Sequence, residues 1–303
     1  MTAERYGGIE AGGTKWVCAV ADASGAIVAR DAFPTAGPSE TLDRAAAFFA
    51  AQPATRAVGI GCFGPIDPRP GSDTYGWITT TPKPGWADVD VVGPLRAALG
   101  VPIAFDTDVN AAALGEWRRG AAQGLGSVVY MTVGTGIGAG AIVDGRIVHG
   151  LLHPEVGHMR VPHDRGRDPF AGSCPRHGDC LEGLASGEAL RRRWGVPAER
   201  LDDPEAWALE AEYLALALVN VTCVLSPQRV IVGGGVGARA GLLGQVRRRL
   251  LELLAGYLPV AELTDHDAVE RYVAAPGLGD DAGVTGAIEL ALAAAPSAAN
   301  PPT

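Results

Sequence analysis

The chain has 303 residues, of which 47% are hydrophobic, and its 25 Lys and Arg against 34 Asp and Glu give a net charge of −9. This acidic balance argues against a nucleic-acid partner, because contacts with phosphates require a basic face. The longest apolar stretch, Leu214 to Leu225, contains Asn220 and Thr222 and is shorter than the ~20 residues that cross a bilayer, so we expect no membrane partner.

The N-terminal sequence MTAERYGGIE lacks the apolar segment after a basic start that is typical of a secretory signal. We therefore expect a cytoplasmic protein. Reduced thiols are expected there, so the five cysteines favour metal binding or buried thiols over disulfides. The length is typical of two domains.

Two segments resemble each other and indicate a duplicated fold. Residues 9–28 and 132–148 each run from a short strand through a glycine loop into a second strand, and then across an Asp/Gly turn into a third. Both patterns are typical of hairpin meanders. They predict two similar halves, each of which offers a glycine loop to a shared cleft.

The other predicted elements follow in chain order. We expect strands at 57–63 and 101–105, helices at 106–117, 204–226, 240–257 and 283–295, and a strand with a glycine loop at 229–237. The proline-rich segment 80–86 cannot form a helix or a central strand, and such loops often carry function. The Gly/Ala-rich residues 119–126 are expected to hold the domain boundary, and 296–303 a frayed tail.

Both glycine loops are candidate phosphate sites. Gly12, Gly13, Thr14 and Lys15 combine free backbone N–H groups with a hydroxyl and a cation, although a tight hairpin turn alone explains the same residues. Residues 134–139 match a dinucleotide fingerprint, but a hairpin follows them where the fingerprint requires a helix, so we reject that interpretation. Within this segment, Thr135 and Gly136 are candidates for a second phosphate loop.

Residues 151–182 have almost no periodicity but contain four of the six histidines and two cysteines. Cys174, His177, Cys180 and the upstream His158 predict a closed tetrahedral zinc site with a structural role. Zinc would supply the folding energy that this aperiodic segment lacks. Surface His and Cys residues without a metal are the alternative, and His153 and His163 remain competing ligands.

Three carboxylates are candidate functional groups. A zinc site would bring Glu155 and Glu182 near one place, which suits a polyhydroxyl ligand, although two solvated acids fit equally well. Asp108 lies where a strand gives way to a helix, and α/β proteins present reactive groups at such strand ends. It is a candidate general base, and an ordinary helix-start acid is the alternative.

Six motifs in order then resemble the ROK family of sugar kinases, within the actin-like ATPase superfamily. They are GIEAGGTK (8–15), DTDVNAAALGE (106–116), VGTGIGAG (133–140), EVGH (155–158), CPRHGDCLEG (174–183) and VGGGVG (232–237). Residues 64–90, with the sequence TPKPGW, resemble the bacterial fructokinase branch. The resemblance implies an α/β, two-lobed actin-like ATPase fold of duplicated ribonuclease H-like halves, with an ATP and sugar cleft between the lobes.

The resemblance also assigns expected roles to lobes and residues. It implies a small lobe at 1–118, joined by the helix at 283–295, and a large lobe at 119–282 that carries the zinc segment 151–183. Asp108 would be the catalytic base. The other residues it implies are Gly12, Gly13, Thr14, Lys15, Thr135, Gly136 and Gly233, Gly234, Gly235 and Gly237 for Mg-ATP; Glu155, His158 and Glu182 for the sugar; and His158, Cys174, His177 and Cys180 for zinc.

Three residues depart from the family pattern. Glu10 and Thr107 stand where many members have Asp and Asn, and His177 stands where other branches have Cys. The expected activity is ATP-dependent conversion of D-fructose to D-fructose 6-phosphate by a homodimer. The alternatives are a kinase for glucose, mannose or an N-acetylated hexosamine, a sugar-responsive repressor, and a zinc-stabilised sugar-binding protein. A repressor would need a DNA-binding domain before Gly12.

Overall fold

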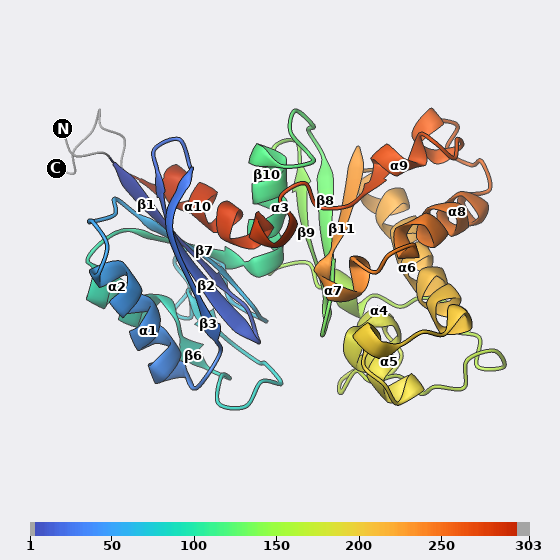
Figure 1. Ribbon diagram of the computed structural model, residues 1–303, viewed down its shortest axis with the longest axis horizontal. Coiled ribbons are helices and arrows are strands. Elements are labelled where there is room, and N and C mark those ends of the chain that lie inside the picture. Colours follow the sequence, from blue (N-terminus) through green and yellow to red (C-terminus); the bar gives the residue numbers. More distant parts are fainter. Residues whose placement is uncertain (1–3, 296–303) are drawn as a thin grey trace. The chain divides into compact units, whose positions relative to one another are not determined.

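The computed structural model describes residues 4–295, which form two compact units (Figure 1). One unit comprises the chain up to Gly120, Val148–His153 and the segment from Asp280 on; the other comprises Ala121–Ile147 and Pro154–Gly279. Residues 148–153, which fall within the expected large lobe at 119–282, group with the first unit, where His149 and His153 contact Asp106 and Asn110. The predicted tail at 296–303 lies outside the described residues.

The first unit is built on a five-stranded sheet of order β3-β2-β1-β4-β7. Its strands are β1 (Arg5–Ala11), β2 (Lys15–Asp22), β3 (Ile27–Pro34), β4 (Val58–Cys62) and β7 (Ile103–Thr107). The β1–β2 and β2–β3 pairs are antiparallel, whereas β1–β4 and β4–β7 are parallel. The carboxyl ends of β1, β4 and β7 therefore lie at one edge, where parallel sheets present their functional groups.

Alternation along β2 explains how both faces of this sheet are buried. Trp16 and Val20 pack in a core cluster with Phe49 of α1, whereas Val17 and Ala21 pack against Ile288 of α10. This period of two is the side-chain repeat of a strand. The helices of the unit are α1 (Pro38–Ala50), α2 (Val92–Leu99), α3 (Asp108–Arg119) and α10 (Ala282–Ala294), and a small ribbon pairs β5 (Trp77–Ile78) with β6 (Val89–Asp90).

Helices α3 and α10 pack backbone to backbone. A Cβ atom on Gly286 of α10 would overlap the carbonyl oxygen of Ala111 in α3, so only glycine permits this approach. The contact holds the N-terminal part of α3 against the sheet, beside the edge at which the parallel strands end. Figure 1 shows α1 and α2 on one side of the sheet and α10 on the other.

The second unit repeats this topology. Its sheet has the order β10-β9-β8-β11-β12. Its strands are β8 (Val128–Val133), β9 (Ile137–Val143), β10 (Arg146–Ile147), β11 (Arg229–Gly233) and β12 (Val273–Ala274). The β8–β9 and β9–β10 pairs are antiparallel, and β8–β11 and β11–β12 are parallel, as in the first sheet. The predicted duplication is confirmed. So is the rejection of a dinucleotide fingerprint, because a strand follows Gly136.

The remaining helices belong to the second unit. They are α4 (Leu181–Ala185), α5 (Gly187–Trp194), α6 (Pro204–Leu225), α7 (Gly234–Gly237), α8 (Leu242–Leu254) and α9 (Val269–Tyr272), with short 3-10 turns η1 (Val156–His158), η2 (Ala198–Arg200), η3 (Ala261–Leu263) and, in the first unit, η4 (Gly279–Asp281). Sequence analysis anticipated α6 and α8 but not α1, α2 or α5.

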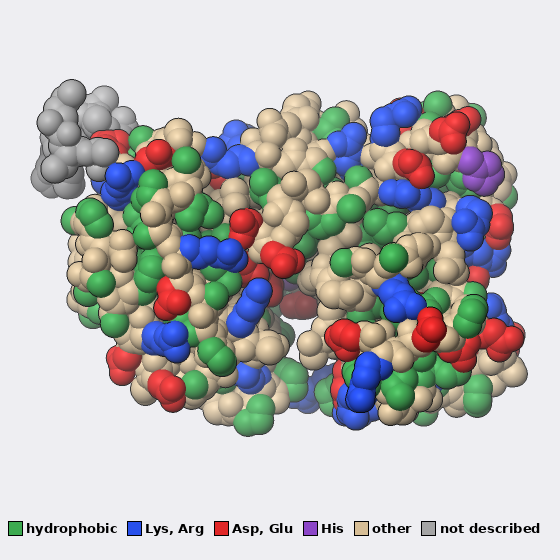
Figure 2. Space-filling model, in the orientation of Figure 1, with side chains coloured by type: hydrophobic (Ala, Val, Ile, Leu, Met, Phe, Trp, Pro, Cys, Tyr) green, Lys and Arg blue, Asp and Glu red, His purple; other side chains and the backbone are tan. Residues whose placement is uncertain are grey.

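Helix α6 has 22 residues, longer than the predicted apolar stretch that ends it. By length and composition alone it could cross a membrane, but more than half of its apolar stretch is buried inside the protein. Leu214 and Leu218 are among its fully buried side chains, as in the core helix of a folded unit. Acidic and basic side chains are interspersed over the face shown in Figure 2.

Candidate functional site

The first glycine loop joins β1 to β2. The backbone N–H of Gly12 donates to the carbonyl of Lys15 at 3.0 Å, and Thr35 closes the loop from the end of β3. The Thr35 hydroxyl donates to the Gly12 carbonyl at 2.7 Å, and its N–H donates to the Thr14 carbonyl at 2.9 Å. Thr14 and Lys15 are exposed, so a hydroxyl and an ammonium face solvent from a loop with a fixed backbone.

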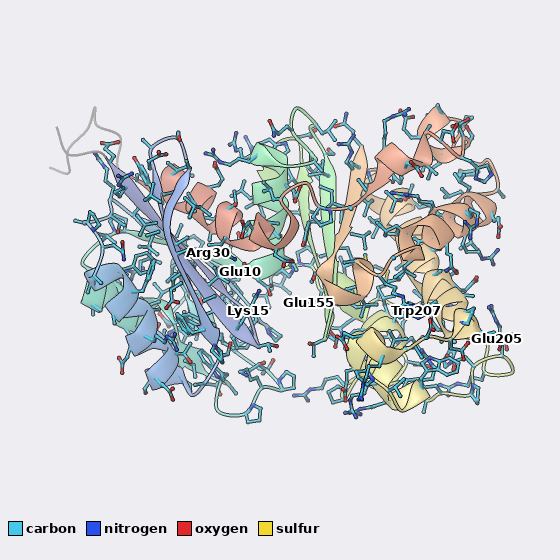
Figure 3. The ribbon with its side chains drawn as sticks, in the orientation of Figure 1. Glu10, Lys15, Arg30, Glu155, Glu205 and Trp207 are labelled. Atoms are coloured by element: carbon cyan, nitrogen blue, oxygen red, sulfur yellow. The ribbon has the colours of Figure 1, made fainter. Side chains whose placement is uncertain are left out.

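Glu10 precedes this loop on β1, Lys15 lies on the adjacent strand β2, and Arg30 lies on β3 beyond it (Figure 3). Its carboxylate also accepts the backbone N–H of Val284 in the first turn of α10. Burial raises the pKa of the Glu10 carboxyl, while Lys15 and Arg30 oppose the rise. Within residues 4–295, Oε2 of Glu10 has no hydrogen-bond donor. The free oxygen can accept from a water molecule of a bound cation.

Asp108 is the first residue of α3, directly after β7. Thr107 is the N-cap, and its hydroxyl accepts the backbone N–H of Asn110 at 3.1 Å. Because this hydroxyl is buried and engaged, it is not free to contact a ligand. The half-buried Asp108 carboxylate accepts the N–H of Val109 at 2.9 Å. Burial raises the pKa of the nearby Cys62 thiol, and Asp108 adds to that rise.

Next to Asp108 lies a polar cluster that sequence analysis did not identify. Asp106 is 4% exposed and accepts from the N–H of Thr107, the amide of Asn110 and the ring of His149. The Asn110 amide nitrogen also lies 3.3 Å from Nδ1 of His153. The pairing of Asp106 with Asn110, four residues apart, could have been predicted from their spacing. No local sequence pattern links them to His149 and His153, which lie about forty residues later.

Residues 64–90, which carry the fructokinase-like motif, form a loop anchored in the core. Trp86 is fully buried, packs 5.4 Å from the ring of Phe63, and donates its indole N–H to the Ala36 carbonyl at 3.0 Å. The buried Asp67 accepts from Arg69, Ser72 and Thr74. These hydrogen bonds hold the pKa of Asp67 well below its usual range. The loop is thus rigidly attached to the first unit.

The second glycine loop joins β8 to β9 and is held by a carboxylate. Oε2 of Glu182 accepts the N–H of Ile137 at 3.0 Å, and a Cβ atom on Gly136 would lie 2.6 Å from the same oxygen. The N–H of Gly187 donates to the Gly134 carbonyl at 2.7 Å. Thr135 is exposed at the tip of the loop. Glu182 thus touches the predicted phosphate loop.

Turn η1 brings Glu155 and His158 to the same place. A Cβ atom on Gly157 would overlap the carbonyl oxygen of Ile137, so glycine lets this turn pack directly on β9. Burial raises the pKa of the Glu155 carboxyl, the Glu182 carboxylate adds to the rise, and His158 opposes it. The two carboxylates and the imidazole therefore interact electrostatically.

The third glycine segment follows β11 in the second unit. Gly233 ends the strand, and Gly234, Gly235 and Gly237 form the short helix α7. Gly234 has a φ of 83°, a left-handed conformation that favours glycine. Gly235 is exposed, whereas Gly237 is buried.

His158, Cys174, His177 and Cys180 form one cluster in which the four candidate ligand atoms lie within 4.8 Å of one another. Nδ1 of His158 is 3.8 Å from the Cys174 sulfur and 3.5 Å from the Cys180 sulfur, and Nδ1 of His177 is 3.6 Å from the Cys174 sulfur. Tetrahedral zinc with ordinary Zn–S and Zn–N bonds separates S and N ligands by about 3.6 Å. The residues therefore fit a zinc ion.

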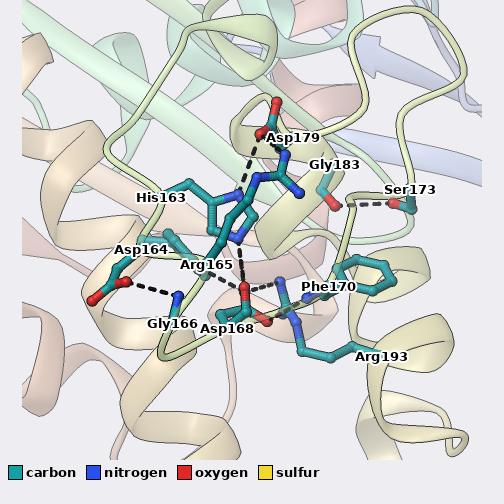
Figure 4. Close-up of polar contacts among 11 residues, drawn as sticks. His163, Asp164, Arg165, Gly166, Asp168, Phe170, Ser173, Asp179, Gly183 and Arg193 are labelled. Atoms are coloured by element: carbon teal, nitrogen blue, oxygen red, sulfur yellow. Dashed lines mark hydrogen bonds and ion pairs between the residues drawn. The ribbon is translucent and has the colours of Figure 1, made fainter.

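The two competing histidines lie elsewhere. His153 contacts Asn110 in the first unit. His163 uses both ring nitrogens, with Nε2 2.9 Å from the Asp168 carbonyl oxygen and Nδ1 3.3 Å from Asp179 (Figure 4). The four-residue set that the family resemblance implied is the one that the structure brings together.

A buried ionic network supports the same segment. Asp168 is 3% exposed and lies 3.0 Å from the guanidinium of Arg193 (Figure 4). It also accepts the Tyr213 hydroxyl at 2.6 Å. Arg193 stacks on the ring of Phe170. These contacts attach the aperiodic segment to α5 and α6. A buried charge without its partner costs several kcal/mol of stability, so this ion pair favours the one arrangement in which Asp168 and Arg193 meet.

The match to known proteins covers nearly the whole chain. The model of the ROK family matches residues 6–294. This chain is a member of the ROK family. It has the two-lobed actin-like ATPase fold of ROK sugar kinases.

Individual ROK relatives are similar over their full length. The chain is 44% identical to a fructokinase from Zymomonas mobilis, covering 95% of this chain and 97% of that protein. It is also 44% identical to a fructokinase from Streptococcus mutans, with 92% and 94% covered. A ROK family glucokinase from Streptomyces griseus, solved in complex with glucose and AMPPNP, is 28% identical, with a TM-score of 0.75 and 95% and 99% covered. The similarity to the fructokinase branch is confirmed.

Proposed function

We propose that this ROK protein transfers the γ-phosphoryl group of ATP to the 6-hydroxyl of D-fructose, giving ADP and D-fructose 6-phosphate. The observation that carries the proposal is the 44% identity to two fructokinases over more than nine-tenths of the chain, against 28% to a glucokinase. Asp108, exposed in part at the start of α3, supplies the general base that this reaction requires.

The mechanism rests on positioning more than on covalent chemistry. Asp108 accepts the proton of the sugar 6-hydroxyl as that oxygen attacks the γ-phosphorus. The carboxylates of Glu155 and Glu182 accept hydrogen bonds from other sugar hydroxyls, and His158 donates to the sugar. Removal of water from the sugar favours transfer to the hydroxyl over hydrolysis of ATP.

The three glycine segments hold the nucleotide in this proposal. Backbone N–H groups and side chains of Gly12, Gly13, Thr14 and Lys15 bind the phosphates, and Thr135 and Gly136 bind them from the second loop. Gly233, Gly234, Gly235 and Gly237 bind near the adenosine. Mg²⁺, when bound, neutralises charge on the β- and γ-phosphates, and the unpartnered Oε2 of Glu10 is suited to orient its water shell.

The four-residue Cys/His cluster binds zinc in this proposal, and the ion is structural because four protein ligands leave no open position. With Nδ1 of His158 engaged by the metal, its Nε2 carries the proton and donates to the sugar. Burial raises the pKa of the Cys180 thiol, so a cation is needed to hold it as a thiolate.

We further propose that the enzyme is a cytoplasmic homodimer. The family resemblance supports the dimer, and the similarity to fructokinases over more than nine-tenths of the chain supports the compartment. Light scattering at micromolar concentration tests the dimer directly: a mass near twice the 31.1 kDa of the chain is expected.

Product identification tests the proposed reaction. Purified protein is incubated with Mg-ATP and D-fructose, and the phosphorus and proton NMR spectra of the product are recorded. We expect the phosphomonoester coupled to the two protons on C6. A phosphate on C1, or ADP and free phosphate without a sugar ester, would contradict the proposal. Turnover of mannose, glucose or an N-acetylated hexosamine alone would support the corresponding alternative kinase.

A further inference from the structure

One short segment lies in the second half of the chain but groups with the first unit. Val148–His153 follows β10 and precedes Pro154, which belongs to the second unit. Leu151 and Leu152 are exposed, so burial of apolar side chains does not hold the segment in place. Its described polar side-chain contacts with the first unit come from two histidines, His149 and His153.

Hydrogen-bond chemistry assigns a role to each imidazole nitrogen. Nε2 of His149 lies 3.1 Å from Oδ1 and 3.0 Å from Oδ2 of Asp106, and a carboxylate only accepts, so Nε2 carries a proton. The amide nitrogen of Asn110 donates to Asp106 at 2.8 Å and also lies 3.4 Å from Nε2 of His149, which carries a proton and cannot accept, so its second hydrogen goes to its remaining partner. Nδ1 of His153, 3.3 Å away, is then the acceptor.

These contacts lie close in the chain to predicted site residues. Asp106 stands two residues before the proposed base Asp108, and Glu155 stands two residues after His153. Through two imidazoles, the junction of β7 and α3 thus tethers the segment 148–153, which leads along the chain into Glu155 and His158.

On the basis of the proposed function, we infer that His149 and His153 are positioning residues for the sugar. Their contacts with Asp106 and Asn110 fix the segment at 148–153, and through it the backbone that presents Glu155. They act on sugar binding through that backbone, and the nucleotide loops at Gly12 and Thr135 do not depend on them. Loss of the tether therefore raises KM for the sugar and leaves KM for Mg-ATP unchanged.

The tether also has a characteristic pH dependence. The hydrogen bond to Asp106 raises the pKa of His149, and partial burial opposes the rise. The titratable groups that face it are Asp106 from β7 and, through Asn110 of α3, His153 of its own segment. The charged tether is complete below the ordinary pKa of histidine and is lost as pH rises through the raised value.

The experiment compares His149→Ala, His149→Gln and the control His266→Ala, which changes an exposed histidine outside this cluster. KM for fructose and for Mg-ATP, kcat and the melting temperature are measured between pH 6 and 9. We expect His149→Ala to raise the fructose KM about tenfold at pH 6.5 with KM for Mg-ATP within about twofold, the scale of one lost charged hydrogen bond.

The conservative variant separates positioning from folding. Gln keeps a donor without a charge, so His149→Gln restores most of the affinity at pH 6.5 and removes the rise in fructose KM at high pH. Asp106→Ala, which removes the acceptor, gives the same loss as His149→Ala, and the double variant adds little to either.

Several outcomes overturn the inference. They are an unchanged fructose KM in His149→Ala, an equal rise in both KM values, or a high-pH rise that persists in His149→Gln. If instead the wild-type protein itself does not phosphorylate fructose, the proposed function fails, and that result is read from the wild type alone.

Discussion

The two glycine loops occupy the same place in two sheets of the same topology, yet different parts of the chain hold them. Thr35, at the end of the adjoining strand β3, fixes the first loop. Glu182, at the end of the aperiodic segment, and Gly187, at the start of α5, fix the second. The first loop is thus part of its sheet, whereas the second depends on a distant segment.

This difference has an energetic basis. The first unit orders its functional groups by burying apolar side chains on both faces of a sheet, with Trp16 and Ile288 on opposite sides. The aperiodic segment of the second unit has few such contacts and uses a Cys/His cluster and a buried ionic network. Metal loss should therefore damage the second loop and spare the first.

The largest expected effect is at the proposed base. Asp108→Asn keeps an oxygen that can accept the N–H of Val109, but it cannot take a proton at neutral pH. We expect kcat to fall about 10³-fold with little change in either KM. Steady-state kinetics checks this, with the exposed Asp43→Asn of α1 as the matched control. A kcat within tenfold of the wild type would remove Asp108 from this role.

Removal of the metal ligands should loosen the second glycine loop and leave the first unchanged. Cys174→Ser with Cys180→Ser is expected to abolish zinc binding and to lower the unfolding free energy by more than about 3 kcal/mol. Hydrogen exchange should increase at the β8–β9 loop and stay unchanged at the β1–β2 loop. The control is Cys223→Ser, which changes an exposed thiol. A wild-type protein without about one zinc per chain would refute the metal assignment.

A core substitution between α3 and α10 should destabilise the first unit instead. Gly286→Ala forces a methyl group against the carbonyl oxygen of Ala111, so we expect a loss of about 3 kcal/mol in unfolding free energy. Gly244→Ala in α8 is the matched control, because a Cβ there has open space and alanine is expected to stabilise the helix by about 0.5–1 kcal/mol. Denaturant titration measures both. Equal effects would show that the α3–α10 contact is not tight.

The two loops can be compared directly through their side-chain supports. Glu182→Ala removes the acceptor of the Ile137 N–H and a proposed sugar ligand, so the KM values for Mg-ATP and fructose should both rise about tenfold. Thr35→Val removes the hydrogen bond to the Gly12 carbonyl, so we expect KM for Mg-ATP to rise about threefold and KM for fructose to stay unchanged. The same pattern for both variants would mean that Glu182 has no role toward the sugar.

The smallest expected effect concerns stability and pH in α6. Glu210 is fully buried, and burial raises the pKa of its carboxyl well above the ordinary value, with Arg193 opposing the rise. The folded state then binds more protons than the unfolded state above about pH 4.5, so stability falls as pH rises. Glu210→Gln should remove this slope and gain about 1 kcal/mol at pH 8. The exposed Glu262→Gln should keep the slope. A steeper fall in Glu210→Gln would contradict the assignment.

Local sequence patterns were sufficient for the longer strands and for the duplication, whereas the two-residue strands β5, β6 and β12 were not predicted. Alternating apolar residues and Asp/Gly turns predict hairpins, and both meanders contain these two features. The short helix α2 lacks a polar N-cap and was missed, as was α1, although Pro38 stands at its start. The requirement for glycine at positions 157 and 286 could not be predicted from local sequence. Each glycine is required because the backbone of a residue distant in sequence packs against it.

The site residues divide in the same way. The candidate metal ligands Cys174, His177 and Cys180 are close in sequence, so their spacing alone could suggest them. Asp106 and His149, in contrast, are 43 residues apart, and no local sequence pattern predicts their contact. The network around Asp168 was missed for the same reason. Long-range polar pairs depend on the final packing, and one sequence without a structure does not contain that information in a local form.

The most direct test of the account is ADP release with Mg-ATP over a panel of fructose, glucose, mannose and N-acetylglucosamine. The account predicts the highest kcat/KM for fructose, at least about tenfold above any other sugar, as expected when one pocket matches one pattern of hydroxyls. A preference for another hexose would contradict the substrate and keep the kinase chemistry. No sugar-dependent ADP release from zinc-loaded protein would contradict the account as a whole.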